Sequence, residues 1–204
     1  MTEIKRIAVF CGSSTGTGEV FMKSAALLGQ EMVRRKIKLV YGGGSVGLMG
    51  QIAKTVAEGL GEDAVLGVIT EDLAPREISG APHGEVKVVP DMHTRKAVMA
   101  QNADAFVALP GGYGTLEEVM EMITWQQLGI HAKPVGFLNV NGLYTKLLSF
   151  FDDIVSAGFV SAPRRAIAQS DTDAAALIDK LIAYQAPDNI IKLAKEGKLD
   201  QARG

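Results

Sequence analysis

The stretch 104–118, DAFVALPGGYGTLEE, constrains the fold of this chain more than any other part of the sequence. Its uncharged apolar run at 105–109 predicts a strand buried on both faces, as found inside parallel sheets. Pro110 ends that strand because it has no N–H to donate. Three glycines follow, at Gly111, Gly112 and Gly114, and Thr115 then opens a helical pattern. This order predicts an anion site, because backbone N–H groups and the helix dipole converge there.

The same alternation of strand and helix runs along the rest of the chain. It predicts an α/β fold, a Rossmann-like doubly wound parallel sheet with helices on both faces. We expect a single domain over 1–184 and a polar tail over 185–204. Strands are predicted at 7–10, 38–41, 64–70, 86–89, 105–109, 134–140 and 166–168. Helices are predicted at about 19–35, 91–102, 116–128, 143–157 and 174–184, with Asp91 as an N-cap and 71–84 as a loop.

Composition excludes several classes of function. The chain has 204 residues, of which 47% are hydrophobic, enough for one sizeable core. A net charge of −2 gives no electrostatic reason to expect nucleic acid or an anionic membrane as partner. Cys11 is the one cysteine and is expected to be a small buried residue, which fits a reducing cytoplasm. No apolar run suggests a signal peptide or approaches the roughly 20 residues of a membrane span.

Small residues follow three of the predicted strands, where ligands of parallel sheets bind. They are the stretch 11–14, the loop that starts at Gly42 and the loop that starts at Gly111. The second loop, GGGSVG at 42–47, matches GxGxxG, and Glu71 after the next strand could bind a ribose. A dinucleotide site is therefore one interpretation. We favour a second glycine loop in the same nucleotide pocket, because the fingerprint usually follows the first strand.

Glu118 has two interpretations. Thr115 and Glu118 have the spacing of a capping box, in which each side chain bonds the other residue's backbone N–H. Alternatively, Glu118 is a catalytic carboxylate held close to a bound phosphorylated sugar. Four other residues also have plain interpretations: Arg95 and Lys96 as an exposed basic face, Glu77 as a loop charge and Thr124 as a helix-surface hydroxyl.

Three stretches carry a family resemblance: PGGYGTLEE at 110–118, YGGGSVGLMG at 41–50 and MHTRK at 92–96. The first resembles the PGGxGTxxE signature, and the last the MHxRK motif, of the Lonely Guy family. Its members are cytokinin-activating nucleoside 5′-monophosphate phosphoribohydrolases, often mislabelled as lysine decarboxylases. The resemblance extends from Cys11 to about Val160. It departs at Thr70, where a proline is common, and over 71–84.

The resemblance implies catalytic roles for Arg95 and Glu118, and a homodimer. Arg95 could grip the phosphate, orient Glu118 or help the purine to leave. No metal or cofactor is expected. The residues expected to contact substrate are Gly12, Ser13, Gly43, Gly44, Glu77, Arg95, Lys96, Gly111, Gly112, Tyr113, Gly114, Thr115, Glu117, Glu118 and Thr124.

The expected function is hydrolysis of the N-glycosidic bond of adenosine 5′-monophosphates, with or without an N6 substituent. The products would be the free base, cytokinin or adenine, and ribose 5-phosphate. A non-catalytic nucleotide sensor that uses the same loops is the alternative. Lysine decarboxylation is not supported, because no lysine lies in the apolar, Gly/Ser-flanked context of a Schiff-base lysine.

Overall fold

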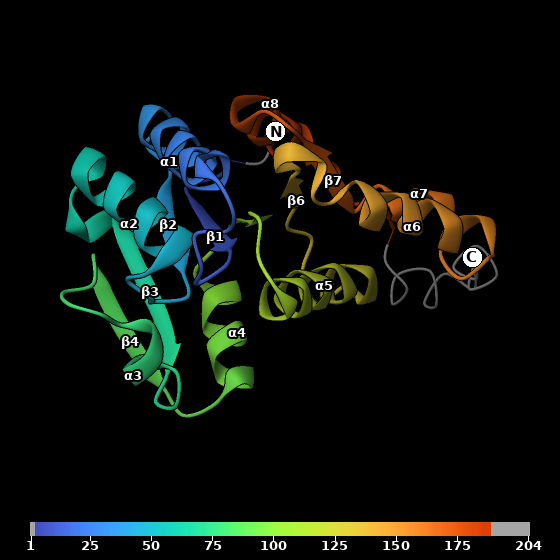
Figure 1. The fold of residues 1–204 in the computed structure, drawn as a ribbon. Helices are drawn as coiled ribbons and strands as arrows, with labels where there is room; N and C mark the ends of the chain where they lie inside the picture. The colour runs from blue at the N-terminus through green and yellow to red at the C-terminus, as the bar shows by residue number, and fades with distance from the viewer. Residues whose placement is uncertain (1–2, 189–204) are drawn as a thin grey trace.

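A computed structural model describes residues 3–188 of the chain (Figure 1). Seven parallel strands form one sheet in the order β4-β3-β2-β1-β5-β6-β7. The strands are β1 (Arg6–Phe10), β2 (Lys38–Tyr41), β3 (Val65–Thr70), β4 (Glu85–Val89), β5 (Ala105–Ala108), β6 (Val135–Leu138) and β7 (Ala168–Asp171). The predicted doubly wound α/β fold is confirmed. Most of the tail predicted over 185–204 lies outside the described residues.

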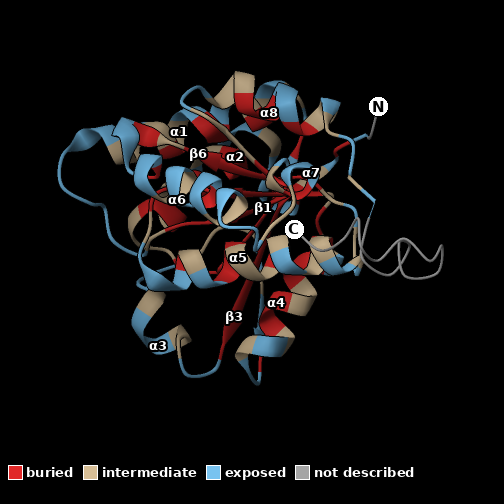
Figure 2. Ribbon diagram, turned by 90° about the vertical axis from the view of Figure 1, so that its right-hand side faces the viewer, coloured by how far each residue is buried: buried red, intermediate tan, exposed pale blue. Residues whose placement is uncertain are grey.

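Helices cover both faces of the sheet, whose strands are mostly buried between them (Figure 2). Ile7 and Val9 of β1 join the core under α1, α2 and α8, whereas Ala8 and Phe10 join the core under α4, α5 and α6. This division follows from the alternation of side chains along a strand. The α-helices are α1 (Glu19–Arg34), α2 (Gly47–Leu60), α3 (Ala74–Glu77), α4 (Met92–Gln101), α5 (Tyr113–Leu128), α6 (Thr145–Ser156), α7 (Ala162–Arg165) and α8 (Ala174–Ala183).

Several predicted boundaries were wrong for local reasons. The loop predicted over 71–84 contains α3, which has a proline in its first turn. The strand predicted over 134–140 is shorter, because Pro134 has no N–H to donate and a 3₁₀ turn, Val140–Gly142, follows β6. The strand predicted at 166–168 is displaced to β7, because α7 and its closing turn occupy the chain as far as Ile167.

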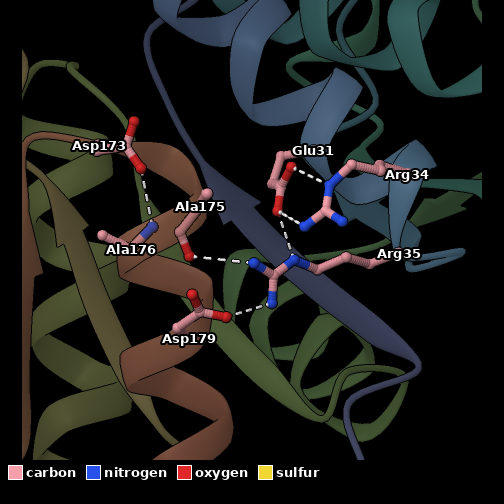
Figure 3. Close-up of polar contacts among 7 residues, drawn as sticks. All are labelled: Glu31, Arg34, Arg35, Asp173, Ala175, Ala176 and Asp179. Carbon is pink, nitrogen blue, oxygen red and sulfur yellow. Dashed lines mark hydrogen bonds and ion pairs between the residues drawn. The ribbon is translucent and has the colours of Figure 1, made fainter.

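An ion-pair network joins α1 to α8 (Figure 3). Glu31 accepts hydrogen bonds from Arg34 and Arg35, and Arg35 also reaches Asp179 of α8 at 2.6 Å. The pKa of the Glu31 carboxyl is lowered to about 2, and the hydrogen bond from Arg34 is the largest cause. The network therefore stays charged at neutral pH and ties α8 to α1.

No helix within 3–188 is both long and apolar enough to cross a bilayer.

Candidate active site

The two central strands, β1 and β5, mark the point where the strand order of the sheet reverses. Chain connections run outward from this pair in opposite directions, which opens a crevice at the carboxyl ends of the two strands. The loops that follow them are in contact, since Gly12 N–H donates a hydrogen bond to the Pro110 carbonyl at 3.0 Å. A cavity of about 290 Å³ lies here, and a second of about 350 Å³ shares Gly12, Ser13 and Gly112 with it.

Helix α5 begins three residues earlier than the sequence pattern suggested. Gly112 is its N-cap, without a side-chain hydrogen bond, so Thr115 lies inside the first turn and Glu118 in the second. The capping-box interpretation of Thr115 and Glu118 is therefore wrong. Because a glycine N-cap has no side chain to bond the first N–H groups, the N-terminus of α5 remains available for an anion.

Arg95 and Glu118 form a buried ion pair across α4 and α5. Their side chains are only 6% and 8% exposed, and Arg95 Nη1 donates to Glu118 Oε1. Arg95 also donates through Nε to the Val68 carbonyl at 2.8 Å and through Nη2 to the Gly42 carbonyl at 3.4 Å. Three elements thus fix the guanidinium, which in turn orients the carboxylate. Of the three roles considered for Arg95, this geometry favours orienting Glu118.

The surroundings of Glu118 raise the pKa of its carboxyl above the ordinary value. Burial is the largest cause that raises the pKa of Glu118; Arg95 opposes it, while Glu117 and Glu77 add to it. The pKa of the half-buried Glu77 carboxyl is also raised, again chiefly by burial. Burial raises the pKa of the Cys11 thiol far above its ordinary value, so the thiol stays protonated. The site therefore holds two carboxyls of unusual proton affinity and no thiolate nucleophile from Cys11.

The structure brings many of the expected site residues together around the 290 Å³ cavity. Its lining includes Gly12, Ser13, Glu77, Arg95, Gly112, Gly114, Thr115 and Glu118. Gly111 lines the adjoining cavity. Gly43 and Gly44 pack against β3 and Glu77 respectively.

Four expected residues lie elsewhere in the chain as described. Lys96 and Glu117 pair with each other outside the cavity lining, and the Tyr113 side chain is 93% exposed. Thr124 donates back to the Met120 carbonyl and lines a separate pocket against α6.

Three apolar residues of the cavity were missed from the sequence: Met49, Leu73 and Met92. Met92 was detectable, because it precedes Arg95 by one helical turn and so shares its face of α4. Met49 and Leu73 gave no such signal, since α2 and the α3 region approach the cavity only through the tertiary fold. Together these side chains give the cavity an apolar wall beside the ion pair.

Gly111 allows the loop to pack closely. A Cβ at this position would lie 2.7 Å from Thr115 Cβ and 2.9 Å from Gly12 N, whereas one at Gly114 would meet nothing within 4 Å. We expect Gly111→Ala to lower the stability by about 1–3 kcal/mol through overpacking. Gly114→Ala, the matched control, is expected to be neutral or slightly stabilising, since alanine favours helix. Thermal melting of both variants checks this, and equal melting temperatures would contradict the close packing described at Gly111.

The sequence of this chain is similar to that of known proteins over most of its length. A family described as "Possible lysine decarboxylase" matches residues 49–181. A probable cytokinin riboside 5′-monophosphate phosphoribohydrolase of Oryza sativa subsp. japonica is 59% identical over 88% of this chain and 79% of its own length. A cytokinin riboside 5′-monophosphate phosphoribohydrolase of Arabidopsis thaliana is 53% identical over 98% of this chain and 93% of its own. The chain belongs to this phosphoribohydrolase family.

Solved structures with lower identity share the fold of this phosphoribohydrolase family member. The molybdenum cofactor carrier protein of Chlamydomonas reinhardtii superposes with a TM-score of 0.64 at 24% identity, covering 87% of this chain and 97% of that one. A molybdenum cofactor binding protein of Rippkaea orientalis gives 0.65 at 20% identity, covering 90% and 98%. At these identities the likeness concerns the architecture alone.

The lysine-decarboxylase description does not suit the site. That reaction requires pyridoxal phosphate on a Schiff-base lysine, and a lysine nucleophile is activated by a lowered pKa. Lys96 is the lysine beside Arg95, and burial does work to lower its pKa. Its hydrogen bonds to Glu117 and Glu121 outweigh burial, so the pKa of Lys96 is raised. Lys96 is therefore a protonated side chain held in ion pairs with Glu117 and Glu121, and it is not activated as a nucleophile.

Proposed function

We propose that this protein hydrolyses the N-glycosidic bond of adenosine 5′-monophosphate or an N6-substituted form of it. Water adds at C1′, and the products are the free base and ribose 5-phosphate. The observation that carries the proposal is the buried Arg95–Glu118 pair beside the glycine N-cap of α5. The relatives named for this reaction, at 52–59% identity, support it.

The proposed binding mode starts from charge. The 5′-phosphate is assigned to the N-terminus of α5, where Gly112, Gly114 and Thr115 line the cavity. The positive end of the helix dipole lies there and attracts an anion. This anchor holds the ribose near Glu118, one turn further along the helix. The base is assigned to the space between Met49, Leu73 and Met92, whose apolar atoms suit a purine face. Glu77 lines the same space, and we assign it a contact to the substrate.

The proposed chemistry follows from the transition state. Cleavage of a glycosidic bond develops positive charge on the sugar, which a nearby carboxylate stabilises. Glu118 supplies that carboxylate, and its raised pKa suits it to take a proton from the attacking water. Arg95 keeps the carboxylate oriented and ionised through their direct hydrogen bond. Burial makes both effects stronger than they would be in water.

The reaction is tested by incubating purified protein with AMP and with N6-isopentenyl AMP and separating the products by chromatography. We expect free base and ribose 5-phosphate in equal amounts. Adenosine, which lacks the phosphate anchor, should be a far poorer substrate. Saturable AMP binding with no base released after long incubation with excess protein would instead support a nucleotide sensor.

We also propose that the protein is an isologous homodimer that uses the α5–α6 face. Large apolar side chains are exposed on or beside these two helices: Leu128 and Ile130 at the end of α5, and Phe150 and Phe159 on and after α6. Thr124 lines a pocket between these helices, close to this face. We expect light scattering at micromolar concentration to give twice the chain mass, and Phe150→Glu to shift it to the monomer. A monomeric wild type would contradict the proposal.

A further inference from the structure

Lys96 is buried next to the catalytic pair but does not line the cavity. Its side chain is 5% exposed, and its ammonium group pairs with Glu117 and, at 2.9 Å, with Glu121. Both partners lie on α5, one helical turn apart, and Glu118 lies between them in the sequence. A lysine shielded from water and held by two carboxylates is an unusual arrangement, because burying a charge is costly unless it is well paired.

Two consecutive cations of α4 thus face three carboxylates of α5. Arg95 pairs with Glu118 toward the cavity, and Lys96 pairs with Glu117 and Glu121 beside it. The two helices lie next to each other in both ribbon views (Figures 1 and 2). A rotation of α5 about its axis that separated Glu118 from Arg95 would also break the Lys96 contacts. The second set of pairs therefore fixes the orientation in which α5 presents Glu118.

Lys96 also affects the pKa of Glu118 through the charges that surround this carboxyl. Glu118 is faced by Arg95 from α4, by Glu77 from the α3 region, by the Cys11 thiol after β1 and by Glu117 on its own helix. Glu117 acts to raise the pKa of Glu118. Lys96 is in direct contact with Glu117 and compensates its negative charge. Without Lys96, the uncompensated carboxylates would make ionisation of Glu118 harder.

We propose that Lys96 is a positioning residue for Glu118: it locks α5 onto α4 through Glu117 and Glu121 and offsets their charge, so that Glu118 stays ionised against Arg95. The catalytic part of this inference rests on the proposed function. The Lys96 side chain does not line the cavity. Its contribution passes entirely through the two flanking glutamates.

A purely structural role of Lys96 predicts a shift in the pKa of Glu118 of the opposite sign. If Lys96 only packed the helices together, its loss would admit water to Glu118. Because burial is the largest cause of the raised pKa of Glu118, that pKa would then fall toward the ordinary glutamate value of 4.5. The positioning role predicts a further rise. The direction of the shift in Lys96→Met separates the two.

The test is a pH titration of the Glu118 carboxyl carbon by ¹³C NMR in the substrate-free protein, with Glu118→Gln identifying the signal. We expect Lys96→Met to raise the pKa of Glu118 by about 0.5–1 unit, since charge effects at contact distance reach 1–3 units. Lys96→Arg should stay near wild type, because it keeps the charge. Glu117→Gln should lower the pKa. Lys54→Met removes an exposed lysine that pairs with Glu58 on α2, and it is the control without effect.

An unchanged or lowered pKa of Glu118 in folded Lys96→Met would overturn the inference. If Lys96→Met does not fold, the pKa of Glu118 is measured in Glu117→Gln instead. An unchanged pKa of Glu118 in that variant would overturn the inference as well. The pH profile of kcat for base release gives a second readout. Its acid limb should move upward in Lys96→Met, a loss of about 3–10-fold on the acid side. A wild type that releases no base refutes the proposed function, whereas the NMR titration still tests Lys96.

Discussion

Arg95→Met is expected to lower both the stability and the turnover of the protein severely. Arg95 is 5% exposed and bonds Glu118 and the carbonyls of Val68 and Gly42, so its removal leaves a carboxylate buried without its partner. Breaking a buried pair on one side costs about 3–5 kcal/mol. For a chain of this size that corresponds to a loss of about 10 °C in melting temperature. Turnover should fall because Glu118 is then neither oriented nor kept ionised.

The double variant Arg95→Met/Glu118→Gln separates the two losses. With both charges absent, no uncompensated charge is buried, and much of the melting temperature should return. Turnover should not return, because the catalytic carboxylate is gone. Arg34→Met removes an arginine whose side chain is 65% exposed and serves as the control. Its melting temperature and its turnover should both stay close to those of the wild type. A double variant no more stable than Arg95→Met would contradict the coupling of these two residues.

Glu118→Gln is expected to lower turnover by roughly 10²–10⁴, the usual contribution of a positioned acid or base. The amide keeps the shape of the side chain and can still accept a hydrogen bond from Arg95, but it carries no charge to stabilise the sugar cation. The melting temperature should also fall, but by less than in Arg95→Met, because Arg95 loses its counter-charge yet keeps a hydrogen-bond acceptor at the same position. The affinity for AMP should hold or improve, since a negative charge near the phosphate is removed.

Glu77→Gln is the matched comparison, because Glu77 lines the same cavity and its pKa is also raised by burial. If Glu77 contacts the substrate without performing the chemistry, its loss should raise KM more than it lowers kcat. Parallel measurements of kcat and KM for the two variants distinguish the roles. The reverse result, a larger fall in kcat for Glu77→Gln, would transfer the catalytic role to Glu77.

The sequence pattern was sufficient for the fold because the central strands β1, β2, β5 and β6 are short and apolar, and helical patterns alternate with strands along the chain. The run 105–109 predicted a fully buried strand, and β5 (Ala105–Ala108) is buried at every position. The glycines after it located the ligand edge of the sheet, since parallel strands present their carboxyl ends together. Asp91 was predicted as an N-cap, and its carboxylate accepts the Thr94 N–H at 2.7 Å.

The details of the site depended on contacts that no local pattern contains. Arg95 and Glu118 are 23 residues apart, and nothing near either one indicates that they pair in the core. The start of α5 was misplaced because the helical period alone does not show whether Gly114 lies before the helix or inside its first turn. Leu73 was assigned to a loop, yet it lines the cavity, because hydrogen bonds hold residues 77–79 against Ser45 in the loop after β2.

The most direct test of the catalytic assignment is a single-turnover measurement of base release from AMP, with protein in excess over substrate. This design isolates the chemical step from product release. We predict rapid release by wild type and a rate roughly 10²–10⁴ lower for Glu118→Gln at equal occupancy of the site. Equal rates for the two proteins would contradict the assignment of Glu118 as the catalytic carboxylate.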